Sequence, residues 1–77
     1  MNAPLPKGVR LLRFEEVAQR TALSRDSIYR LGREGRFPRP IKVSQWASRW
    51  VEAEVQAFID ARIAERDANA PRMSSTG

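Results

Sequence analysis

Ser24 and Gly35 mark the two ends of a short helix, and these end signals constrain the fold more than any other feature of the sequence. A serine hydroxyl can accept a hydrogen bond from an unpaired amide two or three residues later, so Ser24 favours a helix start. Gly35 tolerates the left-handed conformation that ends many helices. The sequence therefore predicts a helix from Ser24 to just before Gly35, with Ile28 and Leu31 on its buried side. Gly32 within it indicates close packing or an early helix end.

A second helical pattern lies immediately before this helix. Glu15 and Glu16 stand where the positive end of a helix dipole favours negative charge. Thr21 to Ser24 then interrupts the pattern, which predicts two short helices joined by a tight turn. This arrangement can place the second helix in a major groove of DNA. The apolar residues whose spacing predicts the first helix are Leu12, Phe14, Val17, Ala18 and then Leu23.

After Pro40 the pattern changes to a hairpin and a longer helix. Ile41 to Val43 alternates as an edge strand does, and Arg49 to Val51 would return as its partner across a loop of residues 44–48. No glycine marks the turn. Trp50 is predicted to lie in the core. A third helix is then predicted from Glu52 onward. The apolar residues that show its helical spacing are Val51, Val55, Phe58, Ile59 and Ile63. The predicted fold is mainly α with a small β-hairpin, a winged helix-turn-helix of three helices and one wing.

The 77 residues have room for one domain. We predict that this domain spans residues 9–68, because residues 1–8 and 69–77 are rich in proline, serine and glycine and are typical of flexible or disordered tails. The chain has no cysteine and no histidine, so disulfides and the usual zinc sites are excluded. Helix packing must supply the stability.

Several function classes find no support in the sequence. No histidine or cysteine nucleophile, paired acids or glycine-rich phosphate loop is present, so we expect no enzyme, no cofactor, no metal and no small-molecule ligand. No apolar run approaches the roughly 20 residues that span a bilayer, and the N-terminus lacks a secretory signal. We therefore expect a cytoplasmic, nucleoid-associated protein without a membrane partner.

The charge pattern favours a polyanionic partner. The formal net charge is +5, and eight basic residues from Arg20 to Arg49 face only Asp26 and Glu34 in the same stretch. Arginine predominates, and its planar group suits bidentate contacts with phosphate or guanine. A solvated helix face would show the same amphipathic pattern, so periodicity and charge alone leave both interpretations open.

Several short motifs occur in an order that resembles a known family. They are Glu16 and Val17, Leu23 to Arg30, Gly35 to Pro40, Trp50, and Glu54 to Ile59. Over about Leu11 to Arg66 the chain resembles the AlpA family of phage and plasmid transcriptional regulators, which is similar to excisionases and to the DNA-binding part of MerR-type regulators. Departures from the family pattern are Ala22 and Ser44, where glycine is usual, and Trp46, where arginine is frequent.

The resemblance implies a division of the DNA contacts. It implies that major-groove bases meet Arg25, Ser27, Tyr29 and Arg30. It also implies a wing, Ser44, Gln45 and Trp46, against a minor groove or the backbone. The side chains that we expect on phosphates are Ser24, Arg33, Arg36, Arg39, Lys42 and Arg49, although basic residues also serve solubility. The Trp46 ring would stack on a sugar or enter a base step, or else pack against the hairpin or a neighbouring molecule in a crystal.

Three functional hypotheses follow. The first is a sequence-specific, double-stranded DNA-binding regulator of mobile-element genes, from a prophage, plasmid or integrative element. The second is an excisionase-like recombination directionality factor that bends attachment-site DNA. The third is a small protein-interaction adaptor with a basic face. Because a module of this size buries only about 600 to 1,000 Å² on DNA, we expect cooperative binding as a homo-oligomer.

Overall fold

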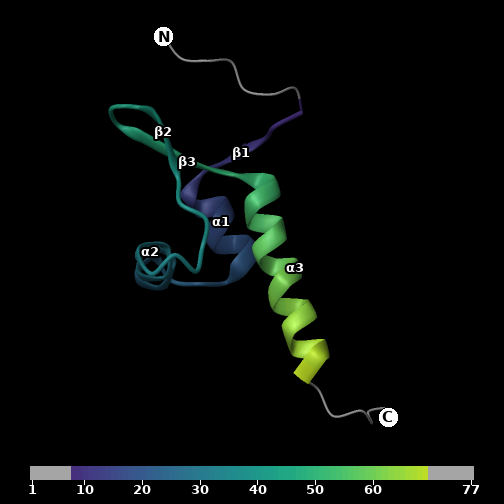
Figure 1. Cartoon of the computed structure of the whole chain (residues 1–77). Coiled ribbons are helices and arrows are strands. Elements are labelled where there is room, and N and C mark those ends of the chain that lie inside the picture. Colours follow the sequence, from purple (N-terminus) through teal and green to yellow (C-terminus); the bar gives the residue numbers. More distant parts are fainter. Residues whose placement is uncertain (1–7, 70–77) are drawn as a thin grey trace.

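The structure, a computed structural model, describes residues 8–69 and contains three helices and a small antiparallel sheet (Figure 1). This confirms the predicted fold class. Of the predicted tails, residues 1–7 and 70–77 lie outside the described range, and Asn69 is the last residue of the third helix. The elements are β1 (Leu11–Leu12), α1 (Phe14–Thr21), α2 (Arg25–Arg33), β2 (Ile41–Ser44), β3 (Ala47–Val51) and α3 (Glu52–Asn69).

The first turns of α1 and α2 are both capped by side chains. The Ser27 N–H donates a hydrogen bond to the Ser24 hydroxyl oxygen at 3.1 Å, so the predicted start of α2 is confirmed. In α1 the side chain of a residue inside the helix makes the cap, because the N–H of Arg13, just before the helix, donates to a Glu16 carboxylate oxygen at 2.8 Å. Acidic residues in the first turn of each helix add a favourable interaction with the helix dipole.

The C-terminus of α2 is closed by the predicted glycine. Gly35 has a φ of 75°, and its N–H donates to the Gly32 carbonyl oxygen at 3.1 Å. The Arg36 N–H donates to the Leu31 carbonyl oxygen at 2.8 Å, which completes a Schellman motif. A Cβ at Gly32 would meet nothing within 4 Å, so close packing is not the reason for this glycine. The alternative prediction, an early helix end, is not found either, because α2 continues through Gly32 to Arg33 and ends where Gly35 predicts.

The turn between α1 and α2 depends on a strained alanine. Ala22 has a φ of 59°, in the left-handed region, and its N–H donates to the Ala18 carbonyl oxygen at 2.7 Å. Thr21 supports the turn, since its hydroxyl donates to the Val17 carbonyl oxygen at 2.9 Å and accepts the Leu23 N–H at 3.3 Å. A residue with a Cβ pays roughly 1 to 2 kcal/mol in this conformation, which explains a preference for glycine here.

The sheet has the order β1-β3-β2 and contains one strand that was not predicted. The apolar spacing predicts Leu12 in the first helix, but this residue lies in β1 and pairs with Trp50 of β3, while α1 begins at Phe14. Two residues are too few to show the alternation of a strand, so the pairing with β3 decides their conformation. The prediction that residues 41–43 form an edge strand is confirmed.

The β2–β3 hairpin is tighter than predicted. Ser44 pairs with Ala47, which leaves Gln45 and Trp46 as the turn instead of a loop over residues 44–48. The register shifts by one residue between Lys42 and Ser44, so the strand bulges near its tip. No glycine is needed, because neither Gln45 nor Trp46 has a positive φ. The turn is also supported by hydrogen bonds, since the Trp46 N–H donates to the Ser44 hydroxyl at 3.3 Å and the Lys42 ammonium donates to the Gln45 carbonyl oxygen at 3.2 Å.

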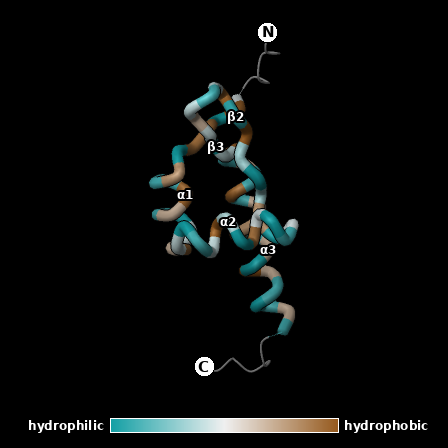
Figure 2. Tube along the Cα trace, turned by 90° about the vertical axis from the view of Figure 1, so that its left-hand side faces the viewer, coloured by the Kyte–Doolittle hydropathy of each residue, from teal (hydrophilic) through white to brown (hydrophobic). Residues whose placement is uncertain are grey.

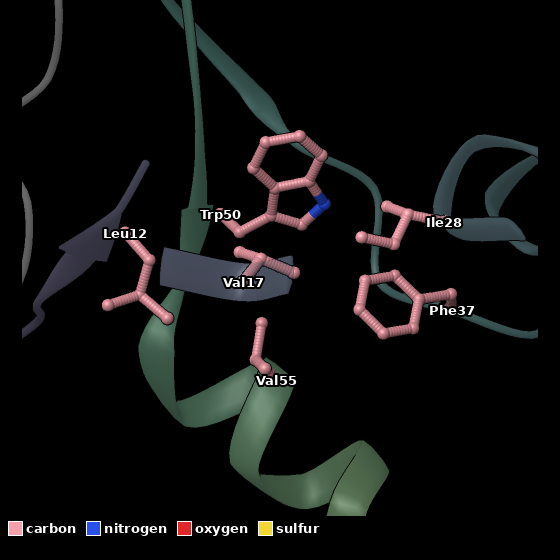
Figure 3. Packing of buried hydrophobic residues seen from close by; sticks show 6 residues of the cluster. All are labelled: Leu12, Val17, Ile28, Phe37, Trp50 and Val55. Carbon is pink, nitrogen blue, oxygen red and sulfur yellow. The ribbon is translucent and has the colours of Figure 1, made fainter. Parts of the chain in front are cut away.

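One apolar cluster joins every helix to the sheet (Figure 3). Trp50 is 1% exposed, which confirms its predicted place in the core. Phe37, from the segment between α2 and β2, packs edge-on against Phe58 of α3 with ring centroids 4.6 Å apart. Beyond this cluster the last turns of α3 are exposed, and Ile63 is 44% accessible. The buried residues are Leu12, Val17, Ile28, Phe37, Trp50 and Val55. Within residues 8–69 no helix has the length and apolarity to cross a membrane.

The strained turn gives a test of the fold with a built-in control. Ala22→Gly is expected to raise the free energy of unfolding by about 0.5 to 1 kcal/mol, because it relieves the positive φ. The same change at the exposed α3 residue Ala57 should lower it by roughly 1 kcal/mol. Urea denaturation followed by circular dichroism measures both. A loss of stability in both variants would show that the turn is not strained.

Candidate nucleic-acid interface

The helix α2 and the β2–β3 hairpin project on the same side of the molecule. In Figure 1 both lie at the left, while α3 lies at the right and extends away from them. Figure 2 views that side directly, and the trace of α2 is largely hydrophilic there. One flat or grooved partner can therefore meet α2 and the hairpin together, with α1 and the sheet between them as support.

Arg25 lies on a stack of aromatic rings at the start of α2. Its guanidinium carbon is 4.1 Å from the centroid of the Phe14 ring and 5.9 Å from that of Tyr29. The Phe14 and Tyr29 rings are nearly parallel at 6.4 Å, and Tyr29 meets Trp50 edge-on at 5.9 Å. A guanidinium held by its flat face keeps its N–H edges free for a bidentate acceptor. The cation–π contact thus favours one orientation of the exposed Arg25 by about 0.5 to 1 kcal/mol.

The other residues predicted to contact bases lie on different flanks of α2. Because each residue turns the helix by about 100°, Ser27 and Tyr29 lie about 160° apart. Ser27 is partly buried, and its hydroxyl accepts a hydrogen bond from the Ser24 hydroxyl at 3.1 Å. Arg30 lies between these flanks and is exposed. The structure thus brings Arg25 and Tyr29 together and places Ser27 away from them.

The basic residues among the predicted phosphate contacts, called the basic band below, come from α2, the segment after it and the hairpin. Arg33, Arg39 and Lys42 are exposed, while Arg49 is partly buried and donates to the Ser48 carbonyl oxygen at 2.8 Å. Arg36 differs from these residues, because an exposed ion pair with Glu34 at 3.3 Å offsets its charge. Among residues 8–69 no ion pair holds Arg25, Arg30, Arg33, Arg39, Lys42 or Arg49.

The hairpin tip exposes an indole ring. Trp46 is 88% accessible, so it does not pack against the hairpin, and that alternative is wrong. Ser44 and Gln45 beside it are exposed as well. An exposed tryptophan at a hairpin tip has a large flat apolar surface without a partner in the described part of the chain. Such a side chain is suited to contact with a sugar ring or a base step.

A polar hollow separates α2 from the hairpin, and it includes residues that sequence reasoning missed. Its walls include Phe14, Tyr29 and Trp46, with the cations Arg13 and Arg49 beside them. The apolar spacing predicts Phe14 only as a core residue of the first helix, although its ring also supports Arg25. Its place at the first position of α1, followed by charged residues, gave no signal for that contact. Arg13 was outside the basic stretch considered, and only the strand β1 brings it to this hollow.

Comparison with known proteins places the chain in a family context. The model of a family described as prophage CP4-57 regulatory protein (AlpA) matches residues 10–63, which include both helices of the helix-turn-helix and the hairpin. An uncharacterised protein of Enterobacteria phage P4, ORF88, is 40% identical over 65 residues, which cover 82% of this chain and 74% of that protein. Both findings agree with the resemblance identified from the order of the sequence motifs.

Proposed function

The chain belongs to the AlpA family of prophage regulatory proteins, and from this premise we propose that it binds specific double-stranded DNA sites and regulates mobile-element genes. Family membership supports a DNA-binding regulator of phage type. In this proposal α2 enters the major groove and the hairpin approaches the adjacent minor groove or backbone. Several copies bind together, since the contact area of one module is small.

The observation that carries the proposal is the orientation of Arg25. Its guanidinium lies over the Phe14 ring, is exposed, and has no ion pair among residues 8–69. A planar cation held on a ring and turned to solvent suits guanine, whose O6 and N7 accept two parallel hydrogen bonds. Tyr29 beside it has a hydroxyl that can donate to a base or phosphate. Arg30 adds a second exposed cation, about 140° around α2 from Arg25.

The basic band supplies affinity without sequence preference. Arg33, Arg39 and Lys42 flank α2 and the hairpin and are exposed. Contacts of such residues with phosphates fix the orientation of a protein on the duplex but do not distinguish bases. In this division Arg25 contributes mainly to discrimination, whereas Arg39 contributes mainly to general affinity.

The exposed Trp46 favours a second candidate function, an architectural factor that bends DNA at recombination sites. Apolar side chains that enter a base step unstack it and kink the duplex. Trp46 is 88% accessible at the tip of a two-residue turn, which suits this role. The two functions are compatible in one protein, because α2 selects the site and the hairpin changes its shape.

Salt dependence separates DNA binding from the role of a protein adaptor. Measured by fluorescence anisotropy with a labelled duplex, log K should fall linearly with log salt concentration. The expected slope is about −4 to −6, if five or six phosphates are contacted. The cause is the release of condensed counterions. A flat titration would contradict DNA binding and leave the adaptor as the explanation.

Paired substitutions test the division between Arg25 and Arg39. Arg25→Ala should reduce discrimination between a selected site and random duplex by about 1 to 3 kcal/mol. Arg25→Lys should lose most of it too, because an ammonium cannot form the bidentate pair. Arg39→Ala should weaken all duplexes alike, and Arg39→Lys should restore them. Equal losses on specific and random DNA from both sites would refute this division.

The fluorescence of Trp46 can report on DNA binding, because the other tryptophan, Trp50, is buried. Subtracting the fluorescence of Trp46→Phe from that of the unchanged chain isolates the Trp46 signal, which bound DNA should shield from acrylamide. In a circular-permutation gel assay, Trp46→Ala should reduce the bend angle while the preferred site stays the same. Val43→Ala, on the same hairpin and 41% exposed, is the control. Equal quenching with and without DNA would exclude contact by this ring.

A further inference from the structure

On the side of α2 opposite the core lies an acidic residue, Asp26, to which the proposed base and phosphate contacts give no role. Asp26 is exposed and lies about 160° around the helix from Ile28, which is 1% exposed in the core. Arg30 and Arg33, one and two turns further along, lie within about 40° of the same line. The residues on the side of α2 opposite the core are therefore Asp26, Arg30 and Arg33, whereas Arg25 lies about 100° from this line.

The carboxylate of Asp26 is not engaged within the described part of the chain. It makes no ion pair or side-chain hydrogen bond among residues 8–69, although Arg30 lies one turn away. Elsewhere in this range acids do pair with arginines, as Glu34 does with Arg36 and Glu52 with Arg20. An unpaired carboxylate on a basic face repels phosphate and lowers affinity for any duplex.

Hydrogen-bonding chemistry limits what this carboxylate can contact on DNA. An ionised carboxylate only accepts hydrogen bonds, and phosphate oxygens have none to give. In the major groove the donors are exocyclic amino groups, N4 of cytosine and N6 of adenine. Arginine has the opposite preference, because it only donates. Asp26 and its arginine neighbours therefore favour different atoms along one groove.

We propose that Asp26, in the first turn of α2 on the same exposed line as Arg30 and Arg33, accepts a hydrogen bond from an exocyclic amino group of cytosine or adenine and so determines specificity. This inference rests on the proposed DNA-binding function. Asp26 lowers affinity for unrelated duplexes through charge repulsion and restores it only where an amino group lies opposite. The competing explanation is that Asp26 only stabilises the N-terminus of α2 through the helix dipole.

The first test is selection of binding sites from duplexes with a randomised 20-base-pair core, a length of about two helical turns. The full chain, Asp26→Ala and Asp26→Asn are compared with Glu54→Gln, which removes one exposed negative charge from the first turn of α3. In Asp26→Ala the preference for cytosine or adenine at one position should fall by about 5- to 150-fold. Its affinity for random duplex should rise, and Asp26→Asn should shift that position toward adenine. Glu54→Gln should keep the original preferences.

The second test removes the amino group from the DNA. At the affected position, 2-pyrimidinone replaces cytosine or unsubstituted purine replaces adenine. This should weaken the unchanged chain and leave Asp26→Ala unaffected. Unchanged preferences in Asp26→Ala, with only a lower melting temperature, would overturn this inference and leave the helix-dipole role. A full chain that selects no site would instead overturn the proposed function, and this inference with it.

Discussion

The packing of Trp50 is the interaction on which the rest of the structure depends. The residue belongs to β3 and pairs with Leu12 of β1, while its ring lies 6.1 Å from Phe14 of α1 and 5.9 Å from Tyr29 of α2. Its indole N–H has no acceptor among the described residues, so shape and burial rather than hydrogen bonding hold it. A domain of this size has only a few kcal/mol of stability, so one large buried ring is a substantial part of it.

The same ring joins the core to the candidate interface. Tyr29 rests on Trp50, Phe14 stacks with Tyr29, and Arg25 lies on Phe14, so the orientation of an exposed cation follows from the packing of a buried tryptophan. A side chain fixed in this way loses less conformational entropy when it binds. The core therefore does more than hold α2 in place, because it also orients a side chain that α2 presents.

The sequence predicted features whose causes are local. Ser24 and Gly35 act through their own hydrogen bonds and backbone conformation, so the limits of α2 were predictable. The apolar stripe of α3 was predictable from its period for the same reason. The strand β1 was not, because Leu11 and Leu12 become a strand only through pairing with Val51 and Trp50, about forty positions later.

The candidate site divides in the same way. The basic band could be predicted because charge is a property of each residue, but the cation–π contact of Arg25 could not, since Phe14 comes from a different helix. The net charge also gave no sign of a role for Asp26, because one negative charge changes a total of +5 only slightly. Its importance emerges only from its place opposite Ile28 on the exposed line of α2. Geometry thus changes which residues of one helix are expected to discriminate between bases.

The central claim is that α2 lies in the major groove, and methylation interference tests it most directly. Dimethyl sulfate methylates guanine N7, an acceptor exposed in that groove and the atom that an arginine such as Arg25 would contact. The account predicts that N7 methylation of one or more guanines within the binding site prevents complex formation. Binding that tolerates methylation at every guanine, and that is instead displaced by a minor-groove ligand such as netropsin, would contradict it.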